Sequence, residues 1–198
     1  VVPRYTRVVD TVESKDNINK AYNLISTSKV RNEMIVDDVI TCITRKQTPV
    51  ILTRFKEHAK FLYDALKGKA DHVFLLYGDN SDKENTEIRG RLKQVPGSES
   101  LVLVATGQKI GEGFDFPRLD VLMLAAPVSF EGRLEQYVGR LNRDYVGKEA
   151  VYVYDYIDSH VRYFDKMYAK RLRTYRKTGF SIWTHKRLLF RHNLCLIY

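Results

Sequence analysis

The chain has 198 residues, of which 44% are hydrophobic and 29% are charged, a composition typical of a globular domain. No apolar run reaches the roughly 20 residues that a membrane-spanning helix needs, so the sequence excludes a membrane-embedded class of protein. The two cysteines, Cys42 and Cys195, have neither CxxC spacing nor a histidine cluster beside them. They predict reduced thiols, no metal site and a cytoplasmic location, with the nucleus as the other possibility.

The formal net charge of +9 lies entirely in the last part of the chain. From residue 160 onward there are ten Lys or Arg residues and one acidic residue, whereas residues 1–159 carry equal numbers of basic and acidic groups. A basic segment of this kind is typical of contact with a polyanion such as a nucleic acid. The alternative is a helix with one solvated basic face.

The expected helices follow an extended start. Residues 1–15 have no helical period, Asp16 is a candidate N-cap for a short helix, and residues 28–45 form a second helix. The later helices are expected at residues 56–66, at residues 82–92 after the cap Ser81, after Ser129, and from the caps Asp158 and Ser159 to Gly179.

Short apolar runs between these helices predict five strands. They are expected at residues 50–53, 73–77, 101–105, 121–125 and 150–154. Strands that alternate with helices at this spacing are typical of a parallel, doubly wound α/β sheet. We therefore expect a connector at residues 1–29, an α/β domain at residues 30–158 and a basic helical extension at residues 159–198.

A helix that presents two arginines on one face is the most informative feature of the sequence. Gln136, Gly139, Arg140 and Arg143 stand at i, i+3, i+4 and i+7, which is one face of a helix. The apolar residues that repeat this spacing on the opposite face are Leu134, Tyr137, Val138 and Leu141. Two guanidiniums side by side suit the binding of phosphate oxygens, and the alternative is a solvated basic face.

A strand followed by a glycine-bearing loop precedes this helix. The run LVLVA at residues 101–105 predicts a strand buried on both faces, and TGQKIGEGFD follows it directly. In open α/β sheets ligands bind at the carboxyl ends of the strands, which places Thr106 beside a ligand. Asp115 adds a carboxylate suited to accept hydrogen bonds from sugar hydroxyls. Taken alone, such a loop is usually only a turn.

Together, these segments resemble the C-terminal RecA-like lobe of superfamily 2 helicases of the DEAD/DEAH type. ATG-x3-GEGFD, which begins at Ala105, resembles motif V of that family, and Q-x2-GR-x2-R, which begins at Gln136, resembles motif VI. PVILTRF at residues 49–55 is similar to motif IV. Gln136, where DEAD-box proteins have histidine, and the run EGFDFPRLDVL point to the branch of type III restriction subunits and excision-repair-type DNA translocases.

The resemblance implies a role for each motif residue. Arg140 and Arg143 match the family's arginine fingers, which stabilise charge on a transferred phosphate, and Gln136, Gly113 and Asp115 match its nucleotide contacts. The expected nucleic-acid contacts are Thr53, Arg54 and Thr106 at strand ends, Gln108 and Lys109 in the loop and, from the charge of the tail, Lys170, Arg171 and Arg173.

Two motifs of a complete ATPase are missing from the sequence. There is no GxxxxGK[ST] loop and no DEAD, DEAH or DECH tetrad, which hold the triphosphate and Mg²⁺ in such enzymes. We therefore expect part of an ATP-dependent helicase, inactive alone, whose missing first lobe holds Mg²⁺ and whose partner is nucleic acid, above all DNA. The alternatives are an RNA helicase lobe and a non-catalytic nucleic-acid-binding or scaffolding module.

Four further polar residues have ordinary interpretations. His58 is expected at the surface or as a helix cap. Asp155, Asp158 and His160 resemble a set of metal ligands, but a strand end and a helix cap explain them better. We therefore expect no metal site in this chain.

Overall fold

The computed structural model describes residues 1–107, 110, 115–128 and 131–183. Three expected site residues, Gln108, Lys109 and Gly113, lie outside the described residues, as do the expected cap Ser129 and residues 184–198. Within the part that the structure describes, no helix is both long enough and apolar enough to cross a membrane.

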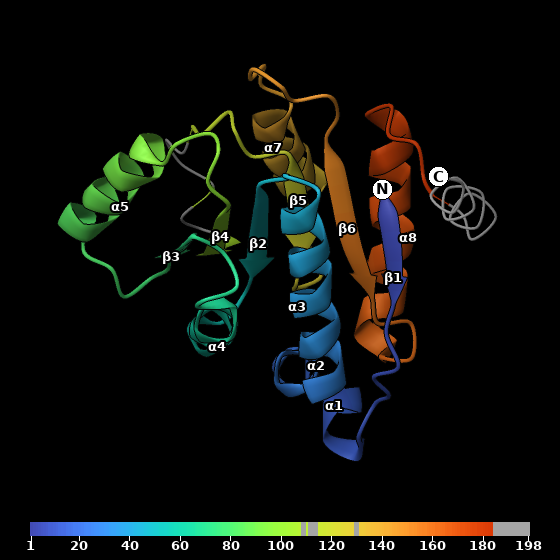
Figure 1. The fold of residues 1–198 in the computed structure, drawn as a ribbon. Coiled ribbons are helices and arrows are strands. Elements are labelled where there is room, and N and C mark those ends of the chain that lie inside the picture. The colour runs from blue at the N-terminus through green and yellow to red at the C-terminus, as the bar shows by residue number, and fades with distance from the viewer. Residues whose placement is uncertain (108–109, 111–114, 129–130, 184–198) are drawn as a thin grey trace, which may run out of the picture.

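In the described part, six strands form one sheet in the order β1-β6-β5-β2-β4-β3 (Figure 1). They are β1 (Val2–Tyr5), β2 (Pro49–Thr53), β3 (His72–Leu76), β4 (Leu101–Thr106), β5 (Val121–Leu124) and β6 (Tyr152–Ile157). Every adjacent pair is parallel, which confirms the predicted doubly wound α/β fold. The apolar runs of the sequence follow from this arrangement, because every residue of β2, β4 and β5 is buried.

Helices cover both faces of the sheet. The helices of the described residues are α1 (Val12–Asp16), α2 (Ile18–Thr27), α3 (Lys29–Thr44), α4 (Lys56–Leu66), α5 (Asp82–Gln94), α7 (Glu131–Leu141) and α8 (Arg162–Lys177), and five of them, α3, α4, α5, α7 and α8, pack on the faces. One face packs against α3 and α4 through a buried cluster that includes Ile35 and Leu62. The other face packs against α5, α7 and α8 through a cluster that includes Leu92, Leu134 and Tyr175.

The short helix α2 lies at the end of the sheet toward which β2 and β6 point (Figure 1). The hydroxyl of Tyr22 donates to the carbonyl of Pro127, in the segment that follows β5, at 2.9 Å. Ala21 and Ile25 pack with Phe164 from the first turn of α8. This end is the carboxyl edge of the strands, where open α/β sheets bind their ligands.

The ends of some elements differ from the sequence prediction. Asn17, and not Asp16, caps α2, because its side chain accepts hydrogen bonds from the N–H groups of Asn19 and Lys20. β6 continues to Ile157, three residues beyond the expected end, since the alternating run YVYDYI pairs with strands on both sides.

In the described residues, the segments expected before and after the α/β domain both pack on it, and the boundaries expected after residues 29 and 158 stay a prediction. β1 pairs with β6 along its whole length, so the N-terminal segment is an edge of the sheet. α8 buries Phe164 and Tyr175 in two of the hydrophobic clusters. The described residues therefore form one α/β unit, of which the basic helix is an outer layer.

Candidate nucleotide and nucleic-acid site

The arginine helix α7 is amphipathic, as the spacing predicts. Its inner residues, with their exposed fractions, are Leu134 (1%), Tyr137 (4%), Val138 (4%) and Leu141 (2%). Gln136 and Gly139 are exposed on the other side, and Arg140 is partly exposed. The apolar face therefore fixes the helix on the sheet, while the polar face is turned outward. That this face binds a nucleotide stays a prediction.

A direct contact joins α7 to the loop that follows β4. The hydroxyl of Tyr137 donates to the carbonyl of Gly107 at 3.0 Å. A Cβ atom at Gly107 would lie only 2.6 Å from that hydroxyl oxygen, closer than real contacts allow. Any larger residue at this position would therefore displace the Tyr137 hydroxyl and disturb the contact between the two segments that carry the helicase-like motifs.

Arg143 lies just beyond the end of α7 and faces Asp115. The distance from Arg143 Nε to Asp115 Oδ1 is 3.5 Å, and the two side chains are 58% and 56% exposed. Because water screens such a pair, it contributes at most about 1 kcal/mol. Two of the residues expected at the nucleotide are thus neighbours, and Arg143 can exchange this carboxylate for a phosphate at little loss.

Two of the expected nucleic-acid contacts sit side by side at the carboxyl edge. Thr53 ends β2 and Thr106 ends β4, and the two are partners in the register of these strands. Their exposed fractions are only 4% and 7%. For either hydroxyl to contact a nucleic-acid strand, that strand must therefore come very close to this edge of the sheet.

Arg54 follows Thr53 directly and is exposed. Its guanidinium carbon lies 4.4 Å from the centre of the Tyr22 ring, and its Nη2 is 3.5 Å from Asn19 Oδ1. Stacking on an aromatic ring orients a guanidinium without neutralising its charge. Among the residues at this edge that are expected to contact nucleic acid, Arg54 therefore has the geometry that best suits a phosphate.

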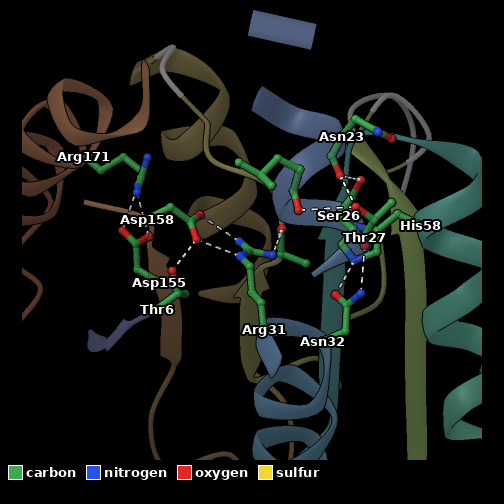
Figure 2. Close-up of polar contacts among 12 residues, drawn as sticks. Thr6, Asn23, Ser26, Thr27, Arg31, Asn32, His58, Asp155, Asp158 and Arg171 are labelled. Atoms are coloured by element: carbon green, nitrogen blue, oxygen red, sulfur yellow. Dashed lines mark hydrogen bonds and ion pairs between the residues drawn. The ribbon is translucent and has the colours of Figure 1, made fainter. Parts of the chain in front are cut away.

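His58 is buried, so the expectation of a surface or capping histidine is wrong. It is 4% exposed and joins the end of β2 to α3 (Figure 2). Asn32 Nδ2 donates to the carbonyl of Ser26 at 2.8 Å, which turns Asn32 Oδ1 toward His58 Nε2 at 2.9 Å. Nε2 must then carry the proton, and Nδ1 accepts from the hydroxyl of Thr53 at 2.7 Å.

This chain of hydrogen bonds decides what Thr53 can do. A hydroxyl has one proton to donate, and in Thr53 that proton is used on His58. A phosphate oxygen has no proton to offer to the remaining lone pairs. The expected phosphate contact through Thr53 therefore does not fit the arrangement, and no local pattern reveals this because Asn32 and His58 lie on different helices.

Arg171 is buried as well, so its expected contact with nucleic acid is wrong. It is 2% exposed, and its Nε and Nη2 donate to the two oxygens of Asp155, each at 2.8 Å. The hydroxyl of Tyr175 donates to the same carboxylate at 2.9 Å. Lys170 and Arg173, its neighbours on α8, are exposed and stay candidates for a phosphate.

A second buried pair holds α3 against the end of β6 (Figure 2). Arg31 Nε and Nη2 donate to the two oxygens of Asp158, at 2.9 and 3.2 Å, and Nη1 donates to the carbonyl of Ala125 at 2.8 Å. Asp158 is therefore an ion-pair partner and not the cap of α8, whose N-cap position is occupied by Val161 without a side-chain hydrogen bond. Among the described residues no group of His, Cys, Asp or Glu side chains could hold a metal ion.

The candidate residues form two groups at opposite ends of the strands. Thr53, Arg54 and Thr106 lie at the carboxyl edge, beside α2. The loop after α7, with Arg143, lies at the other end of the sheet (Figure 1). The segment after Asp115 runs to that end too, since the N–H of Asp120 donates to the carbonyl directly before β2 at 3.3 Å. The residues expected to contact the nucleotide are thus separated from those expected to contact nucleic acid.

Similar proteins have been found among curated sequences, although no protein-family model matches the chain. The chain is 28% identical over 138 residues to transcript termination protein A18 of Yaba-like disease virus, covering 67% of this chain and 28% of that protein. It is 30% identical over 169 residues to putative helicase 161L of Invertebrate iridescent virus 6, covering 81% of this chain and 36% of that protein. The chain thus spans about a third of the length of these relatives.

Solved structures share the fold. T4 UvsW matches with a TM-score of 0.70 at 19% identity, over 92% of this chain and 40% of that one. The SWI2/SNF2 ATPase core of Sulfolobus solfataricus in complex with dsDNA matches with a TM-score of 0.57 at 16% identity, over 81% and 37%. These matches confirm the resemblance that the motifs indicate, while the branch within the superfamily stays a prediction. The chain has the RecA-like α/β fold of superfamily 2 helicase and ATPase domains.

Proposed function

We propose that the chain is the second motor lobe of an ATP-dependent helicase or translocase and that it acts on nucleic acid. The observation that carries the proposal is the α7 region. A helix anchored by its apolar face turns Gln136 outward, carries the partly exposed Arg140 and leads to Arg143, which faces Asp115. The printed names of the viral relatives, a transcript termination protein and a putative helicase, support it.

In this proposal Arg140 and Arg143 act on the phosphates of ATP held at the interface with a first lobe. Guanidinium groups bind phosphate oxygens through paired N–H donors, and an arginine finger of this kind raises the rate by about 10³ to 10⁵. Asp115 and Gln136 orient the nucleotide, as would Gly113. When ATP binds, Arg143 leaves Asp115 and pairs with a phosphate of the nucleotide. This change of partner couples nucleotide binding to the position of this lobe.

The phosphate loop and the Mg²⁺ ligands are assigned to the first lobe. The 198 residues contain no GxxxxGK[ST] sequence, and the described residues contain no cluster of metal-binding side chains. ATP fits the guanidiniums of this chain, whereas Mg²⁺ does not fit its described residues. This lobe therefore contributes positive charge and orientation, and the metal belongs across the interface.

In this proposal the nucleic-acid strand contacts the carboxyl edge of the sheet, at Arg54 and Thr106, and the exposed cations of α8. Such contacts position a backbone without reading its sequence. DNA is the proposed strand, and the similar SWI2/SNF2 core was solved with dsDNA. RNA is the alternative, because one of the two viral relatives is named for transcript termination.

Phosphate release from ATP tests this proposal. The longer protein that contains this chain should hydrolyse ATP in the presence of Mg²⁺, faster with duplex DNA, single-stranded DNA or RNA than without nucleic acid. The isolated chain should hydrolyse none under the same conditions. Turnover by the isolated chain, or a longer protein without nucleic-acid-dependent turnover, would contradict the proposal, and the strand that stimulates most identifies the partner.

A further inference from the structure

One lysine ties together the two segments that carry Arg143 and Asp115. Lys148 lies in the loop between α7 and β6. Its Nζ donates to the carbonyl of Pro117 at 2.9 Å, to the carbonyl of Arg143 at 3.0 Å and to the carbonyl of Leu141. An ammonium group has three donors, and all three are used here.

Each of these carbonyls belongs to a different piece of the candidate site. Leu141 is the last residue of α7, where carbonyls have no partner within the helix and a positive charge is favourable. Arg143 is one of the proposed fingers. Pro117 lies two residues after Asp115. The ammonium therefore links the end of the helix, the backbone of the finger and the segment of the carboxylate that faces it.

The loop is folded so that the lysine can return to α7. Gly147 has φ of +83°, a left-handed conformation that favours glycine, and the N–H of Lys148 donates to the carbonyl of Tyr145 at 3.0 Å. This turn reverses the chain and brings Nζ back to Leu141 and Arg143. Burial lowers the pKa of the Lys148 ammonium, and the nearby carboxylates of Asp120 and Asp144 oppose that shift.

Arg143 needs such a tie because its own contacts are weak. It lies outside α7, so no regular helical hydrogen bonds fix its backbone. Its ion pair with Asp115 joins two side chains that are each more than half exposed, and a pair of this kind fixes little. The three bonds of Lys148 act on the backbone instead and leave the guanidinium able to change partners.

We propose that Lys148 is a positioning residue that holds Arg143 in place opposite Asp115. This inference rests on the proposed function in one respect, the role of Arg143 as a finger. It assigns Lys148 no contact with the nucleotide. It also explains why a long basic side chain stands shortly before β6, where it satisfies carbonyls and where no carboxylate of the described residues lies within ion-pair distance.

The test is a double-mutant cycle on ATP hydrolysis by the longer protein. Lys148→Met keeps the aliphatic stem and removes the donors, and it should lower kcat by about 10- to 100-fold, as expected for a misplaced catalytic group, with a smaller change in KM for ATP. In the Arg143→Ala background the same substitution should have almost no further effect on kcat. Full additivity of the two losses would overturn the proposal, because Lys148 would then act independently of Arg143.

Two further variants separate positioning from general damage. Lys148→Arg should not restore kcat, because a planar guanidinium cannot direct three donors as a tetrahedral ammonium does. Lys93→Met, an exposed lysine near the end of α5, is the matched control and should leave kcat and stability unchanged. Full activity in Lys148→Arg would contradict the geometric part of the argument.

A measurement without ATP separates this inference from the proposed function. Amide hydrogen exchange in residues 142–147 should be faster in Lys148→Met than in the unchanged chain or in Lys93→Met, beyond any global change seen in β2 and β4. Trypsin should also cleave faster after Arg143. If the longer protein hydrolyses no ATP but amide exchange in residues 142–147 is faster in Lys148→Met, the proposed function is wrong and the positioning role of Lys148 is retained. Unchanged exchange and cleavage would overturn the tie itself.

Discussion

At the scale of single residues, buried polar groups decide how the carboxyl edge is built. Arg31 and Asp158 have side chains with no exposed area, and Arg171 and Asp155 are 2% and 1% exposed. Each carboxylate receives two donors from its arginine, and removal of one partner from such a pair costs about 3–5 kcal/mol because the other charge is left buried. These pairs connect α3 and α8 to the sheet near the residues that are proposed to contact nucleic acid.

His58 makes a pH-dependent contribution to stability. Burial, reinforced by the nearby charge of Arg31, lowers the pKa of His58 from 6.5 to about 3. Between these values the unfolded chain binds a proton that the folded chain does not, so the stability falls as the pH falls below 6.5. The loss approaches about 1.4 kcal/mol per pH unit and amounts to about 2 kcal/mol between pH 7 and pH 5.

Urea denaturation of the chain and of His58→Gln isolates this contribution. Glutamine can donate to Asn32 and accept from Thr53, but it does not titrate. The difference in free energy of unfolding between the two proteins should therefore shrink by about 2 kcal/mol when the pH is lowered from 7 to 5. A difference that is the same at both pH values would show that His58 does not stay neutral in the folded chain.

At the scale of elements, α8 has two chemically different sides. Phe164, Arg171 and Tyr175 are buried, whereas Lys170, Arg173 and Arg176 are exposed. The basic helix of the sequence is thus both a layer of the fold and a candidate surface for a polyanion. Substitutions on the two sides should consequently have different effects.

The exposed side predicts a salt-dependent affinity for nucleic acid. Replacement of Lys170, Arg173 and Arg176 by glutamine should leave stability unchanged and weaken binding of a labelled duplex. The slope of log K against log salt should flatten by about 0.9 for each phosphate that the variant no longer neutralises. Arg171→Leu should instead destabilise the chain by about 3–5 kcal/mol in urea denaturation. Unchanged affinity and slope in the triple variant would identify this side as merely solvated.

Local pattern predicts the elements well and their long-range partners poorly. The helix expected at residues 56–66 coincides with α4, and the two faces of α7 are as the spacing predicts. The pairs Arg31–Asp158 and Arg171–Asp155 span 127 and 16 positions of the chain, and no periodicity reveals them. One signal existed: Arg31 stands four and eight positions before Ile35 and Val39, and a charge on the buried stripe of a helix needs a buried partner.

For the candidate site, too, local pattern points to some residues, and long-range contacts are invisible to it. Spacing identifies Arg140 and Arg143, and the loop composition identifies Asp115, because these residues stand in local motifs. Lys148 carries no such signal, since its role depends on three carbonyls that only the fold brings together. Thr53 and Arg171 have the expected residue types in the expected elements, but their donors are used inside the protein.

At the scale of the whole molecule, the two ends of the sheet have different proposed tasks. Arg143, Asp115 and Lys148 lie toward the end where the strands begin, and Arg54 and Thr106 lie where they end. A parallel sheet whose central strands are buried separates the two groups. If the lobe moves as one body, a change of contacts at the nucleotide therefore moves the residues that contact the nucleic acid.

The role of Arg140 and Arg143 as arginine fingers is tested directly by kcat for ATP hydrolysis by the longer protein at saturating ATP, Mg²⁺ and nucleic acid. Arg143→Ala and Arg140→Ala should each lower kcat by at least about 10²-fold, and lysine at either position should not restore it. Arg7→Ala, an exposed arginine outside the site, is the control and should have no effect. Near-normal kcat in either alanine variant, with the fold intact, would contradict the assignment of that arginine as a finger.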